Sequence, residues 1–198
     1  MTKKPQASTH LKPLGQLRII AGQWRGRKLT FTNIEGLRPT PDRVRETLFN
    51  WLNTTVCDAH CLDLFAGSGA LALEALSRGA QHVDLIENAP SAVKQLREQM
   101  RLLKTNKGRI WQDQAEHWLN HFESGQHKPY SIVFIDPPFR TGLVDKCIKL
   151  IENKQVLAPQ AWVYLEMGSN ESLPVLPKHW TIHREKTAGQ VCYRLIAT

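Results

Sequence analysis

The sequence has 198 residues, 41% of them hydrophobic, and a formal net charge of +8 at pH 7. Such a composition excludes general disorder, and no apolar run approaches the roughly 18 residues that a membrane-spanning helix needs. The first ten residues are polar and lack the apolar core of a signal peptide, so we expect a cytoplasmic protein built on one α/β domain.

The positive charge is concentrated near the N-terminus. Residues 1–50 contain ten Lys and Arg against three Asp and Glu, whereas residues 51–198 contain sixteen against fifteen. A basic segment attached to a nearly neutral body is typical of a protein that binds a polyanion. A basic surface that is merely solvated is equally common, so the charge pattern alone leaves both interpretations open.

The chain begins with a segment that we predict to be a flexible tail, residues 1–15, because it has no hydrophobic periodicity. Two short apolar runs follow, at 17–21 and 28–31. The turn between them contains two glycines, two arginines and one tryptophan. Runs of this length around a glycine-containing turn predict a β-hairpin.

A helix is expected next, with Thr40 as its N-cap and Pro41 at its first position. Asp42 suits the positive end of the helix dipole. The apolar residues that follow fall on one face, and Arg43 and Arg45 lie off that face. We therefore expect both arginines to reach solvent or a phosphate group.

From residue 61 onward, strand and helix patterns alternate. Strands are expected at 61–65, 82–86, 109–112, 132–135 and 162–166, and helices at 69–78, 90–105, 114–122 and 143–153. This alternation predicts parallel strands joined by crossover helices that cover both faces of a sheet. Two more strands, at 181–185 and 191–196, predict a closing hairpin that adds an antiparallel strand, for a mostly parallel sheet of seven strands.

A glycine loop follows the first strand of this alternating region. Gly67 and Gly69 allow the backbone to bend sharply and to approach a ligand closely, and the helix that follows presents free N–H groups. Glu87 ends the next strand, where its carboxylate could accept both hydroxyls of a ribose. The residues that we expect to hold a cofactor here are Asp63, Phe65, Gly67, Ser68, Gly69 and Glu87.

Two cofactors fit the glycines, because the same spacing with a distal acid also satisfies the dinucleotide fingerprint. Asp63, four residues before Gly67, discriminates between them. A carboxylate beside an anionic pyrophosphate would be unfavourable, whereas S-adenosylmethionine carries a cationic ammonium and a cationic sulfonium. The acid therefore favours S-adenosylmethionine over a dinucleotide. A turn without a ligand is disfavoured because the strand, the glycines, the helix and the distal acid all occur in register.

Asp113 and Gln114 follow the third strand at the same edge of the sheet. A carboxylate or an amide at this place could bond the amino group of an adenine, which makes both residues candidates for cofactor binding. An ordinary helix N-cap, with Asp113 capping the helix from Gln114, is an equally good interpretation, and both could apply.

The tetrapeptide Asp136-Pro137-Pro138-Phe139 ends the fourth strand, and we predict that it is catalytic. An exocyclic amino group of a base is a poor nucleophile, because its lone pair is delocalised into the ring. The carboxylate of Asp136 and the carbonyl of Pro137 can accept hydrogen bonds from the two N–H bonds of this amino group and so aim the nitrogen lone pair at a methyl group. Phe139 offers a flat face on which the base can stack. Prolines stiffen the loop. The alternative to a catalytic role is a proline-rich turn that only ends the strand.

The cysteines predict neither a metal site nor a nucleophile. Cys57 and Cys61 are separated by three residues, and no second pair or histidine completes a zinc site, so no metal is expected. No cysteine lies in the 136–139 loop, which disfavours methylation of carbon through a cysteine adduct.

Taken in order along the chain, these motifs resemble those of the bacterial 16S rRNA guanine-N2 methyltransferases, which modify one guanine in a hairpin loop of the small-subunit head. The segments that carry the resemblance are RIIAGQWRGRKL at 18–29, LRPTPDRVRETLFNWL at 37–52, LDLFAGSG at 62–69, DPPF at 136–139 and AGQV at 188–191. The glycine loop and DPPF occur in many amino-methyltransferases, whereas the two N-terminal segments are more specific.

The resemblance implies a Rossmann-like class I methyltransferase fold at 55–198, preceded by an RNA-binding extension at 16–54. It also implies S-adenosylmethionine as cofactor and N2 of a guanine in 16S rRNA as acceptor, within a partly or fully assembled small subunit, for an enzyme acting as a monomer. The residues expected to contact phosphate are Arg25, Arg27, Lys28, Arg38, Arg43 and Arg45.

Three alternatives remain at this point. A DNA methyltransferase acting on adenine N6 or cytosine N4 uses related loops, but it normally needs more chain to read duplex DNA. An NAD-dependent oxidoreductase would bind a dinucleotide and transfer no methyl group. A catalytically silent RNA-binding module would tolerate replacement of Asp136.

Overall fold

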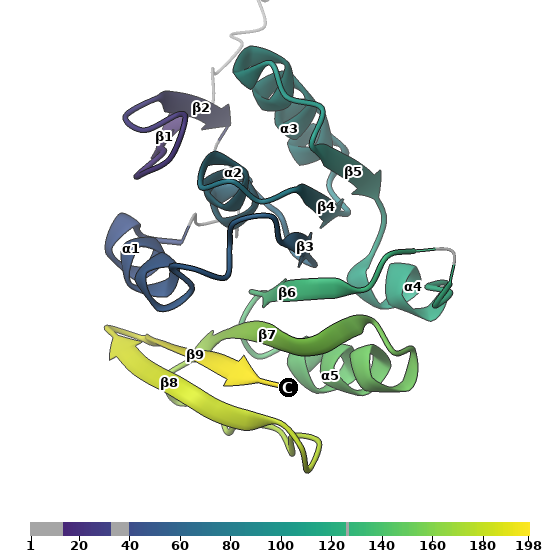
Figure 1. Cartoon of the computed structure of the whole chain (residues 1–198). Helices are drawn as coiled ribbons and strands as arrows, with labels where there is room; N and C mark the ends of the chain where they lie inside the picture. The colour runs from purple at the N-terminus through teal and green to yellow at the C-terminus, as the bar shows by residue number, and fades with distance from the viewer. Residues whose placement is uncertain (1–13, 33–39, 126) are drawn as a thin grey trace, which may run out of the picture.

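Seven strands form one sheet, in the order β5-β4-β3-β6-β7-β9-β8 (Figure 1). The computed structural model describes residues 14–32, 40–125 and 127–198. The strands are β3 (His60–Asp63), β4 (His82–Glu87), β5 (Gly108–Gln112), β6 (Tyr130–Ile135), β7 (Leu157–Gly168), β8 (Thr181–Ala188) and β9 (Val191–Ala197). The five strands β3 to β7 run parallel, and β9 is antiparallel to both β7 and β8. The predicted α/β fold, with seven strands and an antiparallel C-terminal hairpin, is confirmed.

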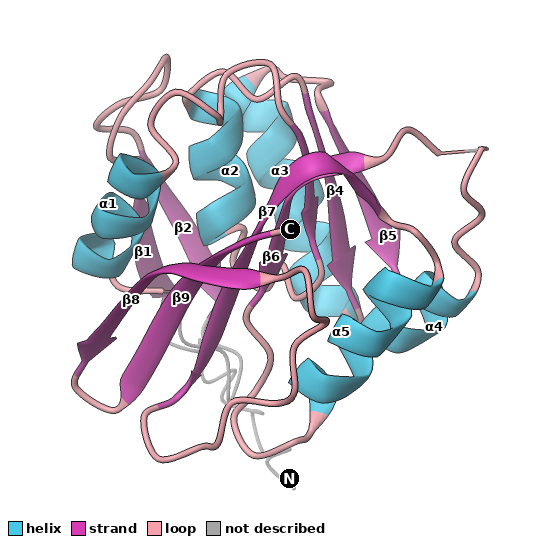
Figure 2. Ribbon diagram, turned by 60° about the horizontal axis from the view of Figure 1, so that its bottom comes forward, coloured by secondary structure: helices cyan, strands magenta, loops and turns pink. Residues whose placement is uncertain are grey.

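Helices cover both faces of the sheet, as predicted. On one face lie α1 (Asp42–Trp51), α2 (Ala70–Ser77) and α3 (Pro90–Leu103), and on the other lie α4 (Ala115–Asn120) and α5 (Leu143–Asn153) (Figure 2). Each face has its own hydrophobic cluster. The central strands are therefore buried on both sides, which explains why they read as continuous apolar runs instead of alternating ones. No helix among the described residues is long and apolar enough to cross a membrane.

The order of the strands in the sheet reverses between β3 and β6, which are neighbours. From β3 it adds β4 and β5 on one side, and it then returns to place β6 and β7 on the other. In open α/β sheets, ligands bind beyond the carboxyl ends of the strands at such a switch point. The loops after β3 and β6 lie next to each other at this switch point, as the motifs predicted, and the space beyond them is called the crevice below.

The N-terminal hairpin is a separate two-stranded sheet of β1 (Leu14–Arg18) and β2 (Lys28–Thr32). It lies beside α2 and α3 instead of extending the large sheet. The first strand ends three residues earlier than predicted, because the backbone N–H groups of Ile20 and Ala21 donate to the carboxylate of Glu74 in α2 and not to a strand. Leu14 and Gly15, expected in the tail, belong to the strand, and residues 1–13 lie outside the described residues.

The predicted cap of α1 is wrong. The residue at the N-cap position is Pro41, the first helical residue is Asp42, and no side chain caps this helix. Thr40 lies one residue further out, and its hydroxyl donates to the carboxylate of Asp136 instead. Short-range helix statistics could not reveal this partner, which is 96 residues away in the chain.

Other strand boundaries also differ from prediction, because pairing with a neighbouring strand determines where each strand begins and ends. The strand β7 begins five residues earlier than predicted, because Leu157 pairs with Tyr130 of β6. The expected five-residue loop between the last two strands is a two-residue turn, since the strands pair up to Ala188 and Val191. Gly189 has a φ of +61°, which a tight turn of this kind requires.

Candidate active site

The acid at the end of β3 is buried beside the glycine loop. Asp63 is 1% exposed, and burial raises its pKa to about 7, with the nearby Glu87 carboxylate adding to the rise. The backbone N–H groups of Phe65 and Ala72 oppose this effect. A buried carboxylate close to a second carboxylate is stabilised in its charged form by a cation, so this part of the crevice suits a cationic group.

The glycine loop is held against β4 by Glu87. The two oxygens of this carboxylate accept the backbone N–H groups of Gly67 and Ala89, each at 2.8 Å. Each carboxylate oxygen has a further lone pair, so both can accept another donor such as a sugar hydroxyl. Gly69 ends the loop with a φ of +80°, and a Cβ there would lie 2.7 Å from the side chain of Leu96. The loop therefore needs glycine at this position for both its conformation and its packing.

Two of the other predicted cofactor residues lie in the same loop. Phe65 is half-buried and Ser68 is buried. The structure thus brings together all six predicted residues of the glycine loop and β4. Their role in binding a cofactor stays a prediction.

Asp113 and Gln114 lie next to this group. The backbone N–H of Asp113 donates to the carbonyl of Glu87, which places it at the end of β5 beside β4. The expected N-cap at Asp113 is wrong, because Gln114 occupies the cap position of α4. The Asp113 carboxylate accepts the N–H of Gln114 at 2.7 Å and lies 2.8 Å from Nδ1 of His117. Contact with an adenine stays a prediction.

The Asp136–Phe139 loop leaves β6 directly beside the glycine loop. Leu64, which follows Asp63, donates its N–H to the carbonyl of Phe134 in β6 at 3.1 Å. Asp136 is half-buried, and burial holds its pKa well above the usual value for a carboxyl group. The neighbouring carboxylate of Glu166 raises it further, whereas the Thr40 hydroxyl lowers it. A hydrogen-bond donor placed next to Asp136 would therefore stabilise the ionised form of its carboxyl group.

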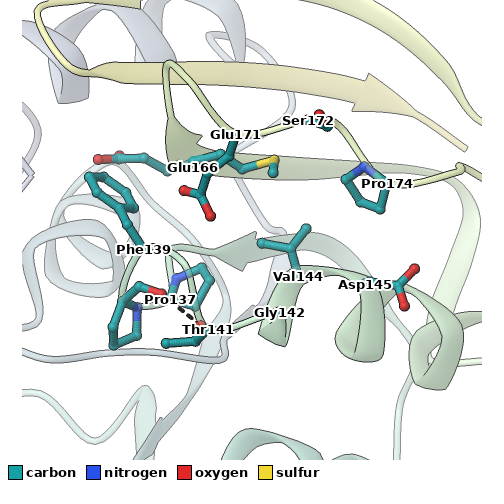
Figure 3. A pocket seen from close by; sticks show the side chains of 12 residues that line it. Pro137, Phe139, Thr141, Gly142, Val144, Asp145, Glu166, Glu171, Ser172 and Pro174 are labelled. Atoms are coloured by element: carbon teal, nitrogen blue, oxygen red, sulfur yellow. Dashed lines mark hydrogen bonds between the residues drawn. The ribbon is translucent and has the colours of Figure 1, made fainter.

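A pocket of about 120 Å³ opens next to this loop (Figure 3). Pro137 and Phe139 form one wall, Val144 of α5 lies beside them, and Glu166 comes from the end of β7 on the opposite side. Phe139 is 42% exposed, so a flat ligand can reach it. The pocket therefore combines an exposed aromatic face with carboxylate acceptors, which is the chemistry that a base with amino and imino donors needs.

Glu166 faces this pocket almost fully buried, at 4% exposure. Burial raises its pKa, and the hydroxyl of Tyr164, which donates to Oε2 at 2.7 Å, opposes the rise. Glu171 lines the same pocket and ties its walls together. Its two oxygens accept the N–H groups of Arg140, just after Phe139, and of Gly168, at the end of β7.

The predicted phosphate-binding residues divide into three groups. Arg25, Arg27, Lys28 and Arg43 are exposed, and Arg38 lies outside the described residues. The prediction for Arg45 is wrong, because its side chain is fully buried. Its guanidinium contacts Glu74, which sits on an apolar helix and draws the arginine inward as a counter-charge.

Sequence reasoning did not connect Thr40, Glu74 and Glu166 with the site, and it considered Thr40 only as a helix cap. A signal existed for Glu74, the single charged residue in the otherwise apolar run ALALEALS. Glu166 offered a weaker signal, since it lies near the carboxyl end of a strand that neighbours β6. The local sequence around Thr40 indicated a helix start and nothing about Asp136. Among the residues that the structure describes, no group of His, Cys, Asp and Glu could hold a metal ion.

Comparison with known proteins decides the family. A family model described as Conserved hypothetical protein 95 matches residues 17–197. The chain belongs to this family. Ribosomal RNA small subunit methyltransferase D of Escherichia coli is 50% identical over 193 residues, which cover 98% of this chain and 93% of that protein. The protein of the same name from Haemophilus influenzae is 44% identical over 186 residues, covering 91% and 93%.

A solved structure gives the same result for the fold. The Escherichia coli protein yhhF, described as a methyltransferase, superimposes with a TM-score of 0.85 at 48% identity, covering 92% of this chain and 98% of that one. The family resemblance drawn from the sequence motifs and the class I methyltransferase fold are both confirmed.

Proposed function

We propose that the protein transfers a methyl group from S-adenosylmethionine to the exocyclic N2 of a guanine in 16S rRNA. The observation that carries this proposal is the meeting of two loops in one crevice. The loop after β3 holds glycines between two carboxylates, and the loop after β6 presents Asp136-Pro137-Pro138-Phe139. The relatives named small-subunit rRNA methyltransferases support ribosomal RNA as the substrate.

The first loop fits the cofactor. S-adenosylmethionine supplies an electrophilic methyl group on a cationic sulfonium, together with an ammonium group. Asp63 offers a buried carboxylate to this positive charge, and Glu87 has acceptor capacity left for the ribose hydroxyls. Gly69 keeps the backbone free of a Cβ, which would clash with Leu96. The carboxylate of Asp63 would repel the pyrophosphate of a dinucleotide, which argues against an oxidoreductase.

The second loop fits the acceptor. Asp136 and the carbonyl of Pro137 accept the two N–H bonds of an amino group, and Phe139 stacks on the base. A base in this position must first leave its stack or its pair. Because its pKa is raised, Asp136 can also take the proton that the nitrogen loses when it gains a methyl group. Much of the rate then comes from holding the two reactants in line.

Glu166 favours guanine over the other bases that carry an amino group. In guanine the ring nitrogen next to the amino group is an N–H donor, whereas in adenine and cytosine it is an acceptor. Glu166 and Pro137 line the pocket, and the Asp136 carboxylate lies next to this lining, close enough to Glu166 for the two charges to interact, so the site offers neighbouring acceptors. Guanine matches them with adjacent donors, but adenine or cytosine would place a lone pair against a carboxylate.

The basic side chains of the N-terminal extension fit a phosphate backbone. Arg25, Arg27, Lys28 and Arg43 are exposed on an extension whose charge is strongly positive. We propose that they contact 16S rRNA within a partly or fully assembled small subunit, and that the protein acts as a monomer in the cytoplasm. Arg38 is proposed to take part with them.

The test is incubation of the protein and labelled S-adenosylmethionine with small subunits that lack the modification, followed by nucleoside analysis. N2-methylguanosine is expected, and Asp136→Ala should abolish it while cofactor binding stays nearly normal. Finding no N2-methylguanosine would overturn the guanine assignment. Transfer to duplex DNA instead of small subunits, assayed in parallel, would support a DNA methyltransferase.

A further inference from the structure

The hydroxyl of Thr40 reaches the proposed catalytic carboxylate from the N-terminal extension. Thr40 is 6% exposed, and its Oγ1 donates to Oδ2 of Asp136 at 3.1 Å. A carboxylate held at one oxygen cannot rotate freely about its Cβ–Cγ bond. The bond therefore orients Asp136 and leaves Oδ1 available for a substrate N–H, because a carboxylate can accept at both oxygens.

The charged groups around Asp136 disfavour its ionised form, which the Thr40 hydroxyl stabilises. Carboxylates of Glu166 from β7 and Asp63 from β3 face it and disfavour its negative charge, as does burial. The Thr40 hydroxyl opposes all three effects. It is thus positioned both to orient the carboxylate and to keep more of it ionised at a given pH.

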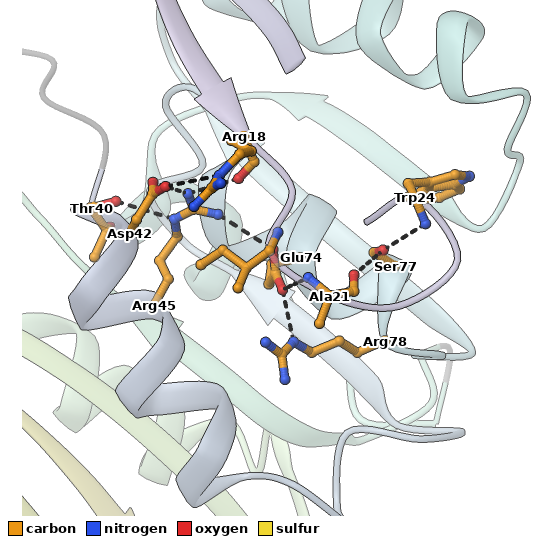
Figure 4. Close-up of polar contacts among 10 residues, drawn as sticks. Arg18, Ala21, Trp24, Thr40, Asp42, Arg45, Glu74, Ser77 and Arg78 are labelled. Carbon is orange, nitrogen blue, oxygen red and sulfur yellow. Dashed lines mark hydrogen bonds and ion pairs between the residues drawn. The ribbon is translucent and has the colours of Figure 1, made fainter. Parts of the chain in front are cut away.

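A buried arginine holds Thr40 in place. Nε of Arg45 donates to the carbonyl of Thr40 at 3.2 Å (Figure 4). Nη2 of the same guanidinium donates to the carbonyl of Arg18 at 2.9 Å and to the carboxylate of Asp42 at 2.6 Å. The guanidinium therefore ties the start of α1 to the end of β1.

Glu74 of α2 anchors the arginine. Its Oε2 lies 3.4 Å from Nη1 of Arg45, and its carboxylate also accepts from Arg78 at 2.8 Å. The N–H groups of Ile20 and Ala21, which follow β1, donate to the same carboxylate at 2.8 and 3.0 Å. One buried carboxylate thus joins the hairpin, α1 and the methyltransferase domain, and the connection runs on through Arg45 and Thr40 to the crevice.

We propose that Thr40 is a positioning residue for Asp136, and that the Arg45–Glu74 pair holds it there, so that the N-terminal extension completes the active site. This inference rests on the proposed catalytic role of Asp136. It gives the extension a role in the chemical step besides any contact with RNA.

The test compares Thr40→Val, which keeps the shape and removes the hydroxyl, with Thr40→Ser, which keeps the hydroxyl. For Thr40→Val we expect kcat on small subunits to fall about 10-fold to 100-fold, the value of one hydrogen bond to a charged group. The KM for S-adenosylmethionine should not change. Thr40→Ser should restore most of kcat.

The pH profile separates positioning from a purely structural effect. Since the hydroxyl lowers the pKa of Asp136, its loss should raise that pKa and move the acid limb of kcat to higher pH. A folded Thr40→Val variant with normal kcat and a normal profile would overturn the inference, as would a serine variant as impaired as the valine one. Thr40→Ala gives the same comparison if the valine variant does not fold.

Asp136→Ala is the companion variant. If it is inactive while Thr40→Val is normal, the inference fails and the proposed catalytic role of Asp136 stands. If Asp136→Ala is itself active, the proposed role fails, and the inference fails with it.

Discussion

Replacement of Arg45 by methionine should destabilise the protein strongly, although the residue belongs to a segment rich in solvent-exposed cations. The guanidinium is fully buried and contacts two backbone carbonyls and the carboxylates of Asp42 and Glu74. Removing one partner of a buried ion pair costs about 3–5 kcal/mol. Because Glu74 keeps Arg78 and two backbone donors, we expect the lower end, about 3 kcal/mol.

The assay is urea unfolding, with the free energy of unfolding obtained from the midpoint at a constant m-value. A loss of about 3 kcal/mol also lowers Tm by roughly 6–12 °C in a chain of this length. Arg43→Met on the same helix is the matched control. Arg43 is exposed, so its replacement should change stability by less than about 0.5 kcal/mol.

The two variants should separate in RNA binding as well. Arg43→Met is expected to weaken binding to small subunits and to reduce its salt dependence, because Arg43 is exposed and is proposed to contact a phosphate. A folded Arg45→Met variant should keep the salt dependence of the wild type. If Arg45→Met were as stable as Arg43→Met, the buried network of Arg45 and Glu74 would not have the structural role described above.

Three further predictions concern the crevice and the basic surface. Because Asp63 has a pKa of about 7 and a cation favours its ionised form, affinity for S-adenosylmethionine should rise as pH increases from about 6 to about 8. Calorimetric titration of wild type and Asp63→Asn tests this, and an equal pH dependence in both would contradict it. Glu166→Gln should lower kcat/KM on small subunits about 10-fold, because a neutral acceptor binds N–H less strongly than a carboxylate. Asp145→Asn, at a more exposed carboxylate of the same pocket, serves as its control, and equal effects would remove the special role of Glu166. Arg25→Gln should reduce the slope of log affinity against log salt by about 1, measured by filter binding, and an unchanged slope would exclude a phosphate contact.

The elements that could be predicted are those decided by local chemistry. The glycine loop at 67–69 and the prolines at 137–138 stand between apolar runs, and together they indicate where strands end. Because parallel strands place their carboxyl ends at one edge, the position of these loops already brings Asp63 and Asp136 into one crevice. The family resemblance added the expected substrate to this arrangement.

The elements that were predicted wrongly depend on distant partners. The strand β1 ends early because Ile20 and Ala21 donate to Glu74, which lies more than fifty residues away. The strand β7 starts early because Leu157 pairs with Tyr130. Local hydrophobic periodicity carries no information on either partner, so these boundaries could not be read from one sequence.

The sequence alone determined the α/β architecture, the two loops of the crevice and the excess of basic residues near the N-terminus. These follow from periodicity, from the backbone freedom of glycine and from charge, all of which are properties of short segments. Only the tertiary structure decided which cations remain at the surface and which one is buried. Arg45 is buried because the packing of α1 against α2 brings it to Glu74, and the hydroxyl of Thr40 donates to Asp136, a residue distant in the chain, instead of capping the helix.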